Sequence, residues 1–162
     1  MGQTTIVAAK PYTFEGYFDV KGLFSYVNKT LEDLGYEVNE KEYEEASKGS
    51  KSIKAKFEAE MPLTDYFLSV IKYSLNVSGK PVTLEEGKKK INTYEGKATF
   101  IIEGILKEDF LEKVEKTPIG RFLSQLYNRY IALDERKEVE GRVKGDVKEV
   151  VSRFKQYLNT SA

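Results

Sequence analysis

The fold is decided by the stretch IKAKFEAEM at residues 53–61, in which apolar and charged side chains alternate. Ile53 and Phe57 belong to the apolar parity, whereas Lys54 and Lys56 belong to the charged one. Strict alternation is typical of a strand that buries one face against a core and exposes the other. The stretch therefore predicts a half-buried strand of an antiparallel sheet.

The same period of two extends on both sides of this strand. Residues 37–46 are expected to pair with it through a turn at 47–52, and further turns are expected at 78–81 and 85–87. The strands that these turns separate are predicted at 67–77, 82–84, 88–94 and 98–106. Both parities of 98–106 are largely apolar, so this strand is expected to be central or covered on both sides.

Helical spacing first appears after an aromatic strand that is predicted at residues 12–18. Val27 and Leu31 belong to an apolar stripe that follows this strand, Asp19 is a plausible N-cap, and Gly35 provides the usual stop. The segment between Asp19 and Gly35 therefore predicts a helix.

Helical spacing returns in the last third of the chain. Thr117 and Pro118 combine an N-cap with a proline at the first helical position, which predicts a helix up to residue 131. The charged segment 134–145 contains two glycines and is interpreted as a connector, and Asp146 is expected to cap a last helix. The predicted fold is α+β: an antiparallel meander sheet of about five or six strands with one N-terminal and two C-terminal helices packed on one face, in a single domain of residues 1–162.

The composition excludes most catalytic chemistry. The chain contains no Cys and no His, so it has no disulfide, no thiolate or imidazole zinc site, no cysteine nucleophile and no Ser-His-Asp triad. It also lacks the glycine motifs that cradle phosphates. We therefore expect a protein that is not an enzyme and that holds neither cofactor nor metal.

Glu103 is the most notable single ionisable residue. It lies between Ile101 and Ile105 on the strand that is expected to be covered. A carboxylate there has a raised pKa unless a lysine or arginine pairs with it. As an acid or base it would need a second polar group, and the sequence names none.

The zero net charge conceals an uneven distribution. Residues 1–46 carry a net charge of −5 and residues 47–100 carry +4. The positive charges lie in and beside the predicted turns, at Lys48, Lys51, Lys54, Lys56, Lys80, Lys88, Lys89, Lys90 and Lys97. If these turns open at one end of the sheet, the lysines form a patch for an anionic partner, such as RNA in a ribonucleoprotein particle (a ribosome) or an acidic protein surface. The alternative is that they only keep strand edges and turns soluble.

Aromatic side chains make up 12% of the chain. Together with Glu103, the residues Tyr127, Tyr130, Phe154 and Tyr157 are candidates for a homodimer interface or a ligand pocket. The alternative is that these aromatic residues simply pack on the sheet.

Two functions follow from these patterns. The first is a non-enzymatic cytoplasmic binding or assembly protein, homo-oligomeric, that docks its lysine-rich hairpins on the anionic partner. The second rests on element order alone, which is similar in outline to the helix-grip (START/Bet v1-like) folds; that resemblance implies a carrier of a small apolar ligand between the sheet and the C-terminal helices. An apolar pocket of a few hundred Å³ would favour the carrier, and a filled core with a basic face would favour docking.

The chain has 26 Lys+Arg and 26 Asp+Glu but no Cys and two Met, a bias that suggests a thermophilic source.

Overall fold

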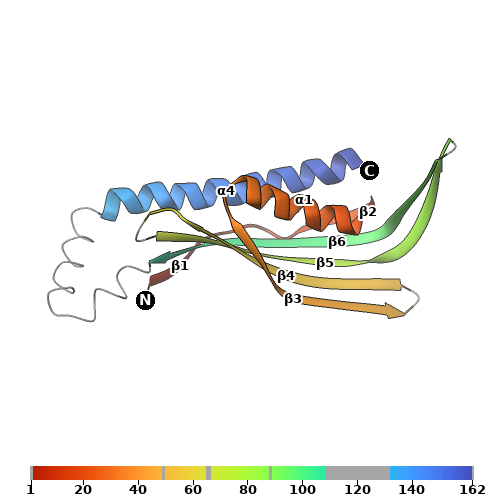
Figure 1. Cartoon of the computed structure of the whole chain (residues 1–162), viewed down its shortest axis with the longest axis horizontal. Coiled ribbons are helices and arrows are strands. Elements are labelled where there is room, and N and C mark those ends of the chain that lie inside the picture. The colour runs from red at the N-terminus through yellow and green to blue at the C-terminus, as the bar shows by residue number, and fades with distance from the viewer. Residues whose placement is uncertain (1, 49, 65–66, 88, 109–131, 162) are drawn as a thin grey trace.

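The protein is described here by a computed structural model that covers residues 2–48, 50–64, 67–87, 89–108 and 132–161. Its elements, in chain order, are β1 (Gly2–Ala8), β2 (Tyr12–Phe18), α1 (Val20–Asp33), β3 (Glu37–Lys48), β4 (Ser50–Pro62), β5 (Phe67–Glu86), β6 (Lys89–Glu108) and α4 (Ala132–Ser161) (Figure 1). The strands form one antiparallel sheet in the order β1-β6-β5-β4-β3, and β2 also pairs with β6. The α+β class and the six-stranded antiparallel sheet are confirmed, and β6 is central as its two apolar parities predicted.

Strand β1 is an addition to the predicted elements. It pairs with the end of β6, from Gly2 opposite Glu108 to Ala8 opposite Glu103. The β-branched run at residues 4–7 is the local signal for it.

Helices α1 and α4 lie on the same face of the sheet (Figure 1). The alternation of β4 directs Ile53 and Ala55 into this layer, and α1 contributes Leu23 and Leu31. Phe154 of α4 is fully buried, in the core rather than at an interface. Burial of a large apolar side chain contributes about 1.5–3 kcal/mol, so this layer is the main source of stability. We call the opposite face of the sheet the outer face.

Strands β5 and β6 form one long hairpin, so the turn predicted at 78–81 is wrong. Gly79 and Gly96 are cross-strand neighbours, and a Cβ on Gly96 would lie 2.0 Å from the carbonyl oxygen of Ser78. Two facing glycines let the backbones approach closely, and the two strands bend here without separating. Figure 1 shows both strands curling towards the helix side beyond this point. The turn expected at 85–87 is confirmed, at Gly87 with φ +64°.

Helix α4 includes the segment 134–145, so its interpretation as a connector is wrong. The helix predicted from Thr117 to residue 131 lies outside the described residues. Gly141 and Gly145 are exposed, and a Cβ added at either would have no neighbour within 4 Å. Each costs the helix only about 1 kcal/mol relative to alanine, which burial of Val139 and Val143 on the opposite side offsets. Among the described residues, no helix combines the length and the apolarity that crossing a membrane requires.

Asp146 lies in the middle of α4, so the prediction that it is a cap is also wrong. It is buried, and its carboxylate accepts a hydrogen bond of 2.7 Å from the hydroxyl of Tyr36. Both carboxylate oxygens also share the single N–H of Arg142 Nε, at 3.0 Å each. The Tyr36 hydroxyl also lies 2.6 Å from Ser69 Oγ on β5, and Arg142 donates to the carbonyl of Leu34. This cluster fastens α4 to β5 and to the chain between α1 and β3.

Stability is expected to fall steeply above pH 10 because two tyrosines cannot ionise inside the fold. Burial raises the pKa of Tyr36 and of Tyr73 well above the ordinary value of 10. In the unfolded chain both ionise from about pH 10 upwards, so the folded state binds more protons and loses stability as pH rises. At pH 11 each tyrosine is expected to lower the unfolding free energy by about 1.4 kcal/mol.

Urea denaturation between pH 8 and 11.5 measures this slope. Tyr73→Phe should reduce the slope by one tyrosine's share, whereas Tyr17→Phe, at an exposed residue, should leave it unchanged. Equal slopes for the wild type and Tyr73→Phe would contradict the assignment.

Candidate functional site

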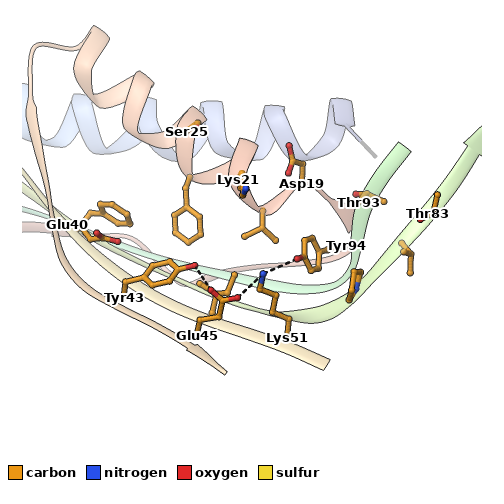
Figure 2. A pocket seen from close by; sticks show the side chains of 16 residues that line it. Asp19, Lys21, Ser25, Glu40, Tyr43, Glu45, Lys51, Thr83, Thr93 and Tyr94 are labelled. Atoms are coloured by element: carbon orange, nitrogen blue, oxygen red, sulfur yellow. Dashed lines mark hydrogen bonds and ion pairs between the residues drawn. The ribbon is translucent and has the colours of Figure 1, made fainter. Parts of the chain in front are cut away.

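A pocket of about 690 Å³ opens between the first turns of α1 and the sheet (Figure 2). We call it the α1 pocket. Its apolar lining comes from α1, from β4 and from the curled part of β5: Val20, Phe24, Ile53, Phe57, Pro81 and Val82. The rings of Phe24 and Phe57, 5.8 Å apart between centroids, form one side. The size is typical of sites for small molecules.

A bulge in β3 decides which side chains of this strand enter the pocket. The register with β4 shifts between Glu40 and Glu42, so that Glu40, Tyr43 and Glu45 all face the helix layer. Without the extra residue, the parity of Glu40 would continue through Glu42 and Glu44 instead. Sequence reasoning missed Tyr43 and Glu45 for this reason, because a bulge has no reliable local signal in a charged strand.

A chain of four polar side chains crosses the sheet side of the pocket (Figure 2). The hydroxyl of Tyr43 donates to Glu45 Oε2 at 3.2 Å, and Lys51 Nζ lies 2.8 Å from Glu45 Oε1. Lys51 Nζ also donates to the Tyr94 hydroxyl at 3.2 Å. Three strands therefore contribute to one hydrogen-bonded array next to an apolar cavity.

The array leaves two hydrogen-bond donors for a ligand. An ammonium group has three N–H bonds, and Lys51 uses two of them on Glu45 and Tyr94. The Tyr94 hydroxyl accepts from Lys51, so its own proton remains available within the described part of the chain. An oxygen acceptor on a ligand can receive both donors.

The charges of the array hold one protonation state at neutral pH. The hydrogen bond from Lys51 lowers the pKa of the Glu45 carboxylate, and hydrogen bonds to Glu45 and Tyr94 raise the pKa of Lys51. Partial burial and the bond to Glu45 raise the pKa of Tyr43. The ammonium, the carboxylate and the neutral phenol are therefore the stable forms, and Lys51 is a donor, not a nucleophile.

The curled end of β5 and β6 closes the far end of the pocket. Thr83, Thr93 and Tyr94 line this end wall (Figure 2). Thr93 Oγ1 donates to the carbonyl of Phe18 at 2.9 Å, which ties the curl to the end of β2. The pocket thus depends on the bend at Gly96.

The interior beneath α4 is filled by aromatic side chains. Phe154 stacks on Phe100 with centroids 4.3 Å apart and meets Tyr12 edge-on at 6.1 Å. Tyr157 is half-buried and stacks on Tyr26 at 4.5 Å. The carrier hypothesis placed the ligand between the sheet and the C-terminal helices, whereas the α1 pocket lies between the sheet and α1. Tyr127 and Tyr130 lie outside the described residues.

The predicted lysines do not gather on one face. Both hairpin turns lie at the same end of the sheet (Figure 1), but Lys51 faces the helices and lines the α1 pocket, whereas Lys54, Lys56 and Lys97 lie on the outer face. Five of the described lysines have a glutamate as cross-strand partner, and Lys89 begins β6. The pairs are Lys54 with Glu44, Lys56 with Glu42, Lys80 with Glu95, Lys90 with Glu85, and Lys97 with Glu15. Lys48 ends β3, and Lys88 lies outside the described residues. Lys56 forms an ion pair of 3.4 Å with Glu42, and the register places a carboxylate residue opposite the other lysines of these pairs.

Glu103 lies half-buried on the outer face of β6. Its cross-strand neighbours are Lys72 on β5 and Ala8 on β1. Within the described ranges, no three carboxylates gather closely enough to hold a metal ion.

Comparisons of the chain with models of protein families, with curated proteins and with solved structures give no match.

Proposed function

We propose that this protein binds a small, mostly apolar ligand in the α1 pocket and does so without catalysing a reaction. The observation that carries this proposal is the array of Tyr43, Glu45, Lys51 and Tyr94 beside an apolar cavity of about 690 Å³. Apolar walls with a few convergent polar groups are typical of ligand sites, where the walls provide affinity and the polar groups fix orientation.

The charge of the lining favours an uncharged ligand. Three carboxylates (Asp19, Glu40 and Glu45) face two ammonium groups (Lys21 and Lys51) around the pocket. An anion gains nothing from a lining with excess negative charge. Because the two available donors belong to Lys51 and Tyr94, the ligand is expected to carry a ketone, ester or amide oxygen.

Docking of the lysine-rich hairpins on an anionic partner stays a prediction, as do homo-oligomerisation and a cytoplasmic location. The cross-strand glutamates weaken the electrostatic argument for docking, because attraction of a polyanion depends on unneutralised cations. Filter binding to RNA at low salt tests it, and no association there would remove the idea.

Lys51→Met is expected to weaken binding of prodan, an uncharged naphthalene fluorophore with one ketone oxygen, by about five-fold. The physical reason is the loss of one hydrogen bond, worth about 1 kcal/mol. Lys54→Met is the matched control, since it removes the same charge from the same strand on the other face. Fluorescence titration measures both affinities, and equal weakening in the two variants would contradict a role for Lys51.

A second variant tests whether the pocket itself is the site. Ser25 is exposed on α1 and lines the pocket, so Ser25→Trp is expected to fill it and to abolish prodan binding. Lys29→Trp, one turn further along α1 and outside the pocket, should bind prodan normally. Normal binding by Ser25→Trp would overturn the proposed site.

A further inference from the structure

A separate groove of about 550 Å³ lies between the end of β1 and α4. Its apolar lining consists of Val7 and Ala9 from the strand side and of Val147 and Val151 from the helix. It shares no lining residue with the α1 pocket. We call it the α4 groove.

Three lysines and one serine complete the lining of the α4 groove. Lys144, Lys148 and Lys155 are four and seven residues apart, which places them on one side of the helix. Within the part of the chain that the structure describes, none of the three forms an ion pair. The groove is therefore a strip of apolar surface next to three cations without a carboxylate partner in the described ranges.

Three carboxylates of α4 that are close to these lysines in the chain form ion pairs with arginines instead. Glu140 pairs with Arg136. Asp146 and Glu149 pair with Arg142 and Arg153. Among the residues that the structure describes, no Asp or Glu lines the groove. Lys155 Nζ lies 5.0 Å from the ring centroid of Tyr12, a cation–π contact that holds this ammonium group beside the groove.

We propose that the α4 groove binds a free fatty acid, with the alkyl chain along the valines and the carboxylate between the lysines. The charge of the lining decides the sign of the ligand's charge, since the described lining contains three ammonium groups and no carboxylate. Size decides its class, because a groove of this volume holds one small molecule. A docked protein would need roughly 1,000 Å² of complementary surface.

This site is independent of the function proposed for the α1 pocket. The lining of the α1 pocket has excess negative charge and takes uncharged ligands, whereas the α4 groove selects anions. A failure at one site therefore says nothing about the other.

Calorimetric titration of the full chain with monomeric laurate tests the proposal. Laurate is expected to bind, and raising the salt from 50 to 500 mM should weaken it several-fold, because exposed charges are screened. Dodecanol and dodecyltrimethylammonium have the same chain without the negative charge, and they should bind at least ten-fold more weakly. Equal binding of the three probes would overturn the assignment.

Two triple variants separate the groove from general charge. Lys144→Gln/Lys148→Gln/Lys155→Gln is expected to weaken laurate at least ten-fold and dodecanol less than three-fold. Lys54→Gln/Lys56→Gln/Lys97→Gln removes the same charge from the outer face and should bind laurate like the wild type. Equal losses in the two variants would overturn the site.

The apolar part of the groove has its own test. Val151→Asn, which makes the strip polar without changing its charge, is expected to weaken laurate and dodecanol alike, and circular dichroism checks that α4 remains helical. Ser25→Trp should not affect laurate binding. Displacement of laurate by prodan would show that laurate binds in the α1 pocket, which would overturn the proposal. Binding to anionic vesicles without binding of monomeric laurate would overturn it too, because it would identify a membrane surface as the ligand.

Discussion

Replacing Gly96 with valine is expected to lower the free energy of unfolding by about 3 kcal/mol and to abolish prodan binding. A Cβ at this residue would lie 2.0 Å from the carbonyl oxygen of Ser78 and 2.5 Å from Cα of Gly79. Both neighbours are backbone atoms that no rotamer change can move. Strands β5 and β6 therefore have to separate at the bend, and the end wall formed by Thr93 and Tyr94 moves with them.

Urea denaturation and prodan titration of the same preparation measure the two effects of Gly96→Val. Gly141→Ala is the matched control, because nothing lies within 4 Å of an added Cβ there. Alanine at this helical position should raise stability by up to about 1 kcal/mol and leave prodan binding unchanged. Wild-type stability of Gly96→Val would show that the close approach of the two strands is not needed for the bend.

Asp146→Ala is expected to lower the free energy of unfolding by about 3 kcal/mol. It removes the acceptor of the hydrogen bonds from Tyr36 and Arg142. Tyr36 is 3% exposed, so its hydroxyl has no water to replace the lost carboxylate and retains only Ser69. For a chain of this size the loss corresponds to a fall in melting temperature of about 6–12 °C.

Differential scanning calorimetry of Asp146→Ala measures this fall, and Glu149→Ala on the same helix is the control. Glu149 forms an i,i+4 pair with Arg153 but is 46% exposed at its side chain, so its removal should cost less than about 0.5 kcal/mol. A double-mutant cycle with Tyr36→Phe isolates the bond to Tyr36. Additive effects of Tyr36→Phe and Asp146→Ala would contradict the coupling.

The α1 pocket could be predicted only in part. Its place in a lysine-rich turn makes Lys51 a candidate residue, but for contact with an anionic partner. In the structure Lys51 contacts Glu45 on β3, 6 residues earlier in the chain, and Tyr94 on β6, 43 residues later. No spacing rule relates residues on three different strands, so the array was invisible before the register was known.

The groove beside α4 escaped prediction for a different reason. Two glycines interrupt the charged stretch at 134–145, a pattern that predicts a connector. As part of a continuous α4, the same segment places Lys144 in line with Lys148 and Lys155. Tertiary packing of Val139 and Val143 overrides the local preference against a helix here.

The sequence by itself determined the elements whose periodicity is local and strong. The alternation of residues 53–61, the stripe that ends at Gly35 and the apolar run at 98–106 each predicted an element that the structure contains. These signals are reliable because burial of one face acts on every residue of a segment at once.

Tertiary structure alone decided which side chains meet. The bulge after Glu40 directs Tyr43 and Glu45 into the α1 pocket, and the register gives the outer-face lysines their glutamate neighbours. The paired glycines, Gly79 and Gly96, convert an expected turn into the bend that closes the pocket. Register, bulges and close approaches are properties of two strands together, so one strand's sequence does not contain them.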